Sequence, residues 1–379
     1  MLLSLWGGDC QVECVYAVDM SPDKRKITSP ADPQLEELCE QLRQLAPGLP
    51  AAGWPEEQLA CCGRQGVFEW FLAPRWGGQA WSDADVIRGY LALSASCLTT
   101  SFVITQRTAA CQRIAASENE TVKRQLLPDL ASGDVFATVG ISHLTTSRRH
   151  LRKDVLRAAE TPAGFRLEGF SPWVTGAPSA EFMVTGATLD DGRQILIVLP
   201  TDTPGVSVPA AADLVALSES QTGPVQCDRV EVHRRWLLAG PVENVMQQRV
   251  GARTGGLQTS TLAIGLAGTA IDYLDQETTK RPDLEPPTES LRSDWQVLKA
   301  QLLDAAAGES VCSNEELRSR ANSLVLRSTQ AALSAAKGSG YVTGHPAGRW
   351  CTEALFFLVW SCPQTVVAAN LCELAGLSE

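Results

Sequence analysis

The chain has 379 residues, of which 44% are hydrophobic and 20% are charged. This composition is typical of a folded protein with two or three packed domains and argues against intrinsic disorder. The formal net charge of −11 argues against nucleic-acid and anionic-membrane partners, because both surfaces would repel the chain. We therefore expect a small-molecule ligand and no nucleic-acid partner.

The first residues do not have the pattern of a secretory signal. Residues 1–20 begin with an apolar run that Asp9 interrupts, and no basic segment precedes that run. No later run is long enough to span a bilayer. The sequence predicts a cytoplasmic protein without a membrane span, in which residues 1–32 form a poorly ordered extension.

Twelve cysteines raise the question of a metal site or disulfides. Cys10 and Cys14 have the spacing of half a zinc site, but no second pair follows and the chain has four histidines. We therefore predict no metal and a reducing compartment. Eight cysteines scattered among apolar neighbours are predicted to be buried thiols, namely Cys39, Cys97, Cys111, Cys227, Cys312, Cys351, Cys362 and Cys372.

Residues 33–130 have the pattern of a helical domain. Leucines three or four residues apart predict a helix from Pro33, and further helices are predicted over 56–65 and 109–127. Ser82 is a predicted N-cap for a helix that extends through Leu93.

Residues 131–236 change to the period-2 alternation of strands. A first strand is predicted from Val135 to Ile141, and Asp190-Asp191-Gly192 is a hairpin signal. A small barrel or sandwich is the simplest arrangement of these segments. The other predicted strands cover 164–170, 181–188, 194–199 and 227–233, the last of them closing the domain.

Residues 237–379 return to helical patterns. The segment 259–274 is rich in glycine and alanine, which predicts close helix packing, and 291–302 carries an apolar stripe. Ser313 and Glu316 form a capping-box pattern, and a last helix is predicted over 363–374. The small-residue helix at 259–274 and the apolar faces of the last helices offer more packing surface than one bundle needs, so we predict a symmetric homo-oligomer.

A corner at 169–184 joins two of the alternating segments and contains Trp173 and Thr175. An indole beside a hydroxyl is more often core packing plus a turn hydrogen bond than a ligand site. Two further segments accompany this corner, LLPDLASGD at 126–134 and the stretch from Gly338 to Trp360. Together the three segments resemble the acyl-CoA dehydrogenase family. In the last stretch the matching positions are Gly338, Gly340, Tyr341, Pro346, Arg349 and Ala354.

The resemblance covers about residue 33 to the end. It implies an α+β fold with an N-terminal helical domain (33–130), a middle β-barrel or sandwich (131–236) and a C-terminal four-helix bundle (237–379). It also implies an FAD flavoprotein of fatty acid metabolism, an oxidoreductase that acts on an acyl-CoA substrate and assembles as a homodimer or homotetramer. The acyl chain and the electron acceptor stay open.

In this family the Trp and Thr of the corner lie against the flavin ring, and the segment 141–147 occupies the place of a second flavin-binding motif. Ordinary strand-end hydroxyls are an equally good interpretation of Ser142, Thr145 and Ser147. The cofactor-binding residues that the resemblance implies are Ile141, Ser142, Thr145, Ser147, Trp173, Val174, Thr175, Gly338, Gly340 and Trp360.

Position 361 is where many family members carry the glutamate that removes the substrate's α-proton. Here the residue is Ser361, and the alternative base position of the family aligns with Gly255 and Gly256. Neither serine nor glycine abstracts a weakly acidic C–H proton at neutral pH. The catalytic candidate is therefore Ser361 with an open role, and an N-cap of the last helix is the alternative role for it.

Three functions remain open on these grounds. The first is acyl-CoA dehydrogenation with a base from another position. The second is a flavin-dependent monooxygenase reaction, which needs no α-proton base. The third is a catalytically inactive flavin-binding or structural protein on the same scaffold.

Overall fold

The computed structural model describes residues 26–48, 53–145, 155–248 and 256–377. Most of the predicted N-terminal extension, 1–32, lies outside these ranges, but its last residues pack against the helices. Ile27 is fully buried, and its N–H donates to the Gln65 carbonyl at 3.0 Å. The packed N-terminal region therefore begins before residue 33.

The N-terminal helices begin where side chains satisfy their free N–H groups. Asp32 accepts from the Gln34 N–H at the start of α1, and Ser82 accepts from the Asp85 N–H at the start of α3, as predicted. The helix predicted over 109–127 is instead two helices, because Asn119 caps a new one. The helices are α1 (Pro33–Leu45), α2 (Glu56–Arg64), α3 (Asp83–Ser96), α4 (Leu98–Ala116) and α5 (Glu120–Ser132).

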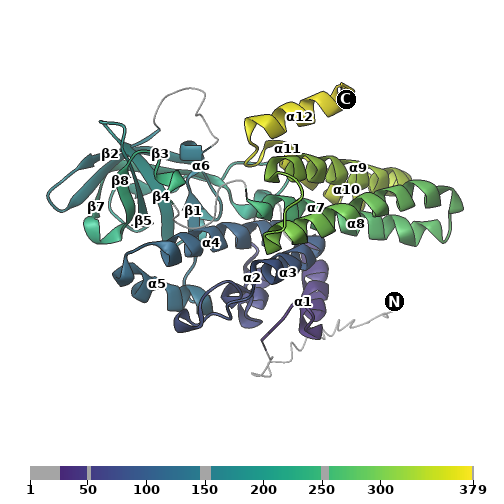
Figure 1. Ribbon diagram of the computed structural model, residues 1–379, viewed down its shortest axis with the longest axis horizontal. Helices are drawn as coiled ribbons and strands as arrows, with labels where there is room; N and C mark the ends of the chain where they lie inside the picture. The colour runs from purple at the N-terminus through teal and green to yellow at the C-terminus, as the bar shows by residue number, and fades with distance from the viewer. Residues whose placement is uncertain (1–25, 49–52, 146–154, 249–255, 378–379) are drawn as a thin grey trace, which may run out of the picture.

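The middle of the chain forms one eight-stranded sheet in the order β6-β7-β3-β2-β4-β5-β8, and β1 pairs with β4 outside this order. β4 pairs in parallel with β1 and β2 and antiparallel with β5. Figure 1 shows the sheet at one end of the molecule, with α4 running beneath β1. The strands are β1 (Ala137–Gly140), β2 (Leu156–Glu160), β3 (Gly164–Val174), β4 (Phe182–Leu189), β5 (Gln194–Pro200), β6 (Val206–Ser207), β7 (Gly223–His233) and β8 (Leu237–Val242).

The strand predictions are confirmed for β1, β3, β4, β5 and β7, and Gly192 (φ 86°) makes the predicted hairpin turn. The sequence did not predict β2, β6 or β8. The prediction that β7 closes the sheet is wrong, because β8 follows it and pairs with β5. The β-domain was predicted to end at residue 236, but β8 follows and contains Pro241, which an edge strand tolerates because its N–H need not join the ladder.

The C-terminal helices pack beside α3 and α4, at the other end of the molecule from the sheet (Figure 1). α7 contacts α3, α8, α9 and α10. Ser313 accepts from the Glu316 N–H and begins α9, as predicted. The helices are α7 (Leu257–Thr278), α8 (Glu285–Ala307), α9 (Asn314–Gly340), α10 (Pro346–Ala354), α11 (Phe356–Val359) and α12 (Gln364–Leu374).

The small residues of α7 serve packing within the chain. A Cβ on Gly265 would lie 2.8 Å from the Leu91 carbonyl of α3, so only glycine permits this approach of the two helices. This surface is therefore not available for self-association, contrary to the expectation from sequence. Among the exposed apolar side chains, Leu371, Leu374 and Leu377 lie close together in sequence, on α12 and just after it.

Burial of the cysteines is less complete than predicted. Cys312, Cys351 and Cys362 are half-buried and Cys372 is exposed, because these positions lie on outer helix faces or in turns. Cys10 and Cys14 lie outside the described residues. Within the described ranges no group of His, Cys, Asp and Glu could hold a metal ion, and no helix is long and apolar enough to cross a membrane.

Candidate functional site

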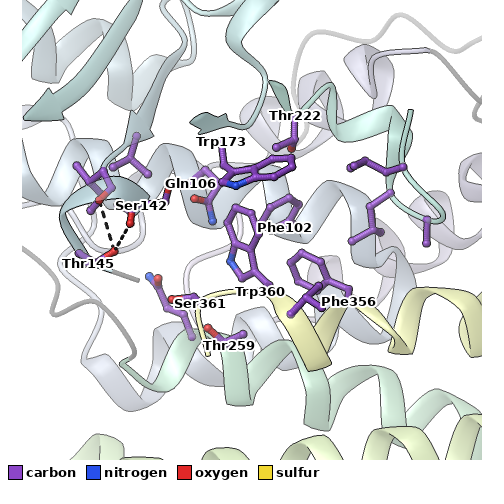
Figure 2. Close-up of a pocket in the computed structure, with 18 of the residues that line it drawn as sticks. Phe102, Gln106, Ser142, Thr145, Trp173, Thr222, Thr259, Phe356, Trp360 and Ser361 are labelled. Atoms are coloured by element: carbon purple, nitrogen blue, oxygen red, sulfur yellow. Dashed lines mark hydrogen bonds between the residues drawn. The ribbon is translucent and has the colours of Figure 1, made fainter. Parts of the chain in front are cut away.

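A cavity of about 540 Å³ lies where the sheet, α4 and the C-terminal helices meet. The β-domain contributes β1, the short helix α6 (Ser142–Thr145), the end of β3 and the loop before β7 to its lining. The helices contribute α4, the start of α7, α10 and α11. In Figure 2, Trp173 lies above Phe102 and Trp360, and Ser142 and Thr145 lie toward the other end of the cavity. Segments more than 250 residues apart in the chain thus form one site.

The end of β3 places the Trp173 side chain in the cavity, and the two residues that follow it are buried. The Trp173 side chain is 42% exposed, whereas Val174 and Thr175 are buried. The Thr175 hydroxyl pairs with the Thr222 hydroxyl at 2.9 Å, and the Thr138 hydroxyl donates to the Thr175 carbonyl at 2.7 Å. These buried bonds fix the strand end behind Trp173, so Thr175 supports the wall and its hydroxyl does not line the cavity.

The wall from β1 and α6 contributes hydroxyl groups. Ile141, Ser142 and Thr145 line the cavity, and the Thr145 hydroxyl donates to the Ile141 and Ser142 carbonyls at 3.4 and 3.3 Å. The Ser142 Oγ is buried and has no hydrogen-bond partner among the described residues. The Oγ has almost no accessible surface, so Ser142 lines the cavity through its other atoms and its hydroxyl is not open to a ligand as the structure stands.

Three aromatic rings close the opposite end. Phe102 of α4 meets Phe356 and Trp360 edge-on, at centroid distances of 4.8 and 4.7 Å. Phe356 and Trp360 stack on each other at 5.3 Å. Because each ring contacts the other two, this aromatic cluster is a rigid apolar floor.

The turn after α11 brings Ser361 to the cavity in an unusual backbone conformation, with φ at 47°. Buried side chains of α9 hold this turn. Arg318 Nη2 donates to the Trp360 carbonyl at 3.1 Å, and Asn322 Nδ2 donates to the Phe357 carbonyl at 2.9 Å. Burial lowers the pKa of Arg318 to about 10.

Ser361 does not cap the last helix. The N-cap position of α12 is Pro363, which makes no side-chain cap bond. The interpretation of Ser361 as an N-cap is therefore wrong, because the helix begins two residues later than that role requires.

The cavity is poor in charge. Among the described residues that line it, none is an aspartate or a glutamate, and Arg113 is the cation. Arg113 Nη1 donates to the Ala109 carbonyl of its own helix at 2.8 Å, and burial lowers the pKa of Arg113 to about 10. Gly256, one of the two alternative base positions, lines the cavity without a side chain, and Gly255 lies outside the described residues.

A buried carboxyl lies next in sequence to the lining residue Thr352. Glu353 of α10 does not line the cavity, and its Oε1 lies 3.7 Å from Arg349 Nε. Burial raises the pKa of Glu353 to about 7, with Glu219 adding to the rise and Arg349 opposing it. This carboxyl therefore stays protonated to near neutral pH.

The predicted site residues are brought together only in part. Ile141, Ser142, Thr145, Trp173, Trp360 and Ser361 line the same cavity. Val174 and Thr175 lie buried behind it, Gly338 and Gly340 lie in the last turn of α9 outside its lining, and Ser147 falls outside the described residues.

Sequence reasoning missed most of the α4 and α7 contributions. Phe102 and Gln106 are four residues apart on one face of α4, and Gln258 and Thr259 stand in the first turn of α7. α4 is buried on nearly all sides, so its sequence has no apolar stripe that would set the cavity face apart. Thr222 was missed too, because its place beside Thr175 depends on how β3 and β7 pair.

No family model matches the chain. In sequence it is similar to the probable acyl-CoA dehydrogenase YngJ of Bacillus subtilis (strain 168), with 24% identity over 192 residues. The match covers 49% of this chain and 49% of that protein, so it spans about half the length of the relative.

Two solved structures share nearly the whole fold. An FAD-dependent dehydrogenase superposes with a TM-score of 0.76 at 20% identity, covering 92% of this chain and 99% of the other. Butyryl-CoA dehydrogenase from Megasphaera elsdenii superposes with a TM-score of 0.78 at 16% identity, covering 90% and 97%. The chain therefore has the acyl-CoA dehydrogenase fold, and the resemblance to that family is confirmed in sequence over half of the chain and in fold over nine tenths of it.

Proposed function

We propose that this protein is a flavin-dependent oxidoreductase that binds FAD in the cavity beside Trp173. The observation that carries the proposal is the half-exposed Trp173 in a cavity of about 540 Å³, on a strand end whose neighbouring residues are buried. An indole held in this way offers a flat apolar face to a planar ring. The FAD-dependent dehydrogenase described above has the same fold, which supports this choice of cofactor.

The residues of the cavity fit a flavin. Trp173 supplies an apolar ring surface, and the side chains of Gln106 and Thr259 in the lining supply hydrogen-bonding groups. Gly256 leaves the start of α7 free of a side chain, with the N–H groups of its first turn not capped by a side chain. FAD, when bound, supplies the capacity to exchange a hydride with a substrate.

The cavity favours a substrate reaction in which no side chain removes an α-proton, such as that of a flavin-dependent monooxygenase. The sequence resemblance assigns the position of the family's base to Ser361, and no described lining residue is a carboxylate. The role left to Ser361 is to donate or accept a hydrogen bond at the cavity wall. Its turn is held by Arg318 and Asn322, which donate to the Trp360 and Phe357 carbonyls.

Acyl-CoA dehydrogenation is the second candidate, supported by the sequence similarity to a probable acyl-CoA dehydrogenase. It requires a base from outside the described lining of the cavity.

Spectroscopy of the purified protein tests both the binding of FAD and the choice between the two candidate reactions. We expect FAD to remain bound after gel filtration, with a protein-bound flavin spectrum that is not bleached by octanoyl-CoA under anaerobic conditions. Bleaching without added reductant would select the dehydrogenase reaction. A protein that stays colourless after incubation with FAD would overturn the flavin function.

We also propose that the protein self-associates, through the exposed apolar end of the chain at Leu371, Leu374 and Leu377. Apolar side chains grouped on one exposed segment are costly in water and typical of an interface. Sedimentation at micromolar concentration is expected to give a mass above the 40.7 kDa of one chain, and Leu371→Glu is expected to lower that mass. A monomer mass for the unmodified protein would contradict this.

A further inference from the structure

The aromatic cluster of Phe102, Phe356 and Trp360 has a geometry that a general apolar wall does not need. Two of its three contacts are edge-on and one is stacked, at centroid distances between 4.7 and 5.3 Å. All three rings line the cavity, so a ligand at this end meets aromatic side chains. An aromatic ligand that packs on them edge-on or stacked gains attraction beyond simple burial.

The surroundings of the cluster are apolar as well. Val215 is 85% exposed, Val359 is 79% exposed and Leu355 is 44% exposed, and all three line the cavity. Exposed side chains that also line a cavity lie at its mouth, so a ligand enters past apolar groups. The described cation of the lining, Arg113, is almost fully buried and bonds a carbonyl of its own helix. This entrance therefore favours an uncharged ligand.

We propose that the substrate of this site is an uncharged planar aromatic molecule, bound against Phe102, Phe356 and Trp360. The inference rests on the proposed function, because it assigns the substrate of the same flavin site. A saturated ring or an alkyl chain gains only from the apolar area that it buries. An aromatic ring gains in addition from each ring that it meets, by about two- to tenfold in affinity per pair.

A pair of probes with similar shape and different aromaticity tests this. We would measure the binding of 2-naphthol and of its saturated counterpart decahydro-2-naphthol by calorimetry, to the protein with and without FAD. We expect 2-naphthol to bind about tenfold more tightly or better, since it meets more than one ring. Octanoyl-CoA serves as the third probe, and it is expected to bind more weakly than 2-naphthol.

Substitutions in the aromatic cluster test whether the preference for 2-naphthol comes from these rings. Trp360→Leu and Phe356→Leu keep apolar bulk, and each is expected to weaken 2-naphthol binding about fivefold while leaving decahydro-2-naphthol unchanged. Trp360→Phe keeps a ring and is expected to retain most of the preference. Trp350→Leu is the matched control, because Trp350 lies on α10 and does not line the cavity. Thermal melting confirms that each variant is folded.

The outcomes separate this inference from the proposed function. Equal binding of 2-naphthol and its saturated counterpart, or tighter binding of octanoyl-CoA, would overturn the aromatic substrate. Bound FAD with no binding of 2-naphthol would do the same and leave the flavin function standing. Preferential 2-naphthol binding by a protein that does not take up FAD would support the aromatic site and remove the flavin function.

Discussion

The two walls of the cavity differ in how far they match the sequence pattern of the acyl-CoA dehydrogenase family. The β3 wall keeps the Trp-x-Thr corner, and buried hydroxyls of Thr138, Thr175 and Thr222 fix it. The helical wall keeps the turn but has Ser361 where the family's base would stand. Arg318 and Asn322 hold that turn as firmly as the hydroxyls hold the strand end.

This difference shows that the fold can keep a turn in place while the side chain that the turn carries changes. Burial of the Arg318 guanidinium is costly unless it is hydrogen-bonded, and its bond to the Trp360 carbonyl offsets part of that cost. Substitutions on either wall test this contrast.

The largest effect is expected from Ser361→Glu, which restores a carboxylate to the helical wall. General-base catalysis typically contributes 10²- to 10⁴-fold, so bleaching of bound FAD by octanoyl-CoA is expected to appear or to accelerate by about that factor. Anaerobic stopped-flow absorbance measures it. Ser361→Gln is the matched control, with similar size and no basic group. Absence of bleaching in Ser361→Glu as well as in the unmodified protein would end the acyl-CoA hypothesis.

The next largest effect is expected on the pH dependence of the free energy of unfolding, through Glu353 behind the helical wall. Its pKa in the folded protein is about 7, against an ordinary value of 4.5. Between these values the folded state binds more protons than the unfolded state, so the free energy of unfolding falls as pH rises from about 4.5 to about 7. The fall from this group is about 3 kcal/mol.

Urea denaturation at a series of pH values measures this dependence. Glu353→Gln is expected to remove most of the fall in the free energy of unfolding. Glu309→Gln is the control, because Glu309 is exposed. Parallel pH profiles for the unmodified protein and Glu353→Gln would show that the ionisation of this carboxyl does not lower the free energy of unfolding.

A smaller effect is expected on the β3 wall from Thr175→Val. The substitution keeps the shape of the side chain and removes its buried bond to Thr222, which costs about 1 to 2 kcal/mol of the free energy of unfolding. Thr329→Val is the control, because that buried hydroxyl donates only to carbonyls of its own helix. Equal denaturation midpoints for the two variants would mean that the Thr175 bond does not stabilise the wall.

The smallest effect is expected from Trp173→Ala. Loss of one aromatic contact weakens FAD binding by about 1 kcal/mol, or about fivefold. Flavin retention in equilibrium dialysis measures it, with Trp350→Ala as a control outside the cavity lining. Unchanged retention in Trp173→Ala would count against the placement of FAD at the β3 wall.

The sequence alone predicted the helix starts and strands that depend on residues close together in the chain. Ser82 and Ser313 cap the helices they were assigned to, and the alternation at the start of β3 gives the buried face that carries Phe165 and Leu167. The resemblance also named Trp173 and Ser361, which line one cavity although they lie far apart in the chain.

The remaining features depend on contacts that no local pattern encodes. Phe102 lies on a helix buried on nearly all sides, so periodicity could not select its cavity face. β8 contains a proline, which is acceptable only because the strand lies at an edge of the sheet. The role of Thr175 as a support depends on Thr222, which β7 brings beside it.

The close approach of α3 and α7 has a consequence for the synthesis of the chain. The Thr269 hydroxyl of α7 donates to the Ala95 carbonyl, across 174 residues of sequence. At a typical rate of translation, α3 therefore waits roughly 10 to 35 s for its partner to be made. During that time the side chains of Ile87 and Leu91, which later join the core with α7, lack their main cover. Until α7 is made, α1 and α4 are the helices made by then that contact α3.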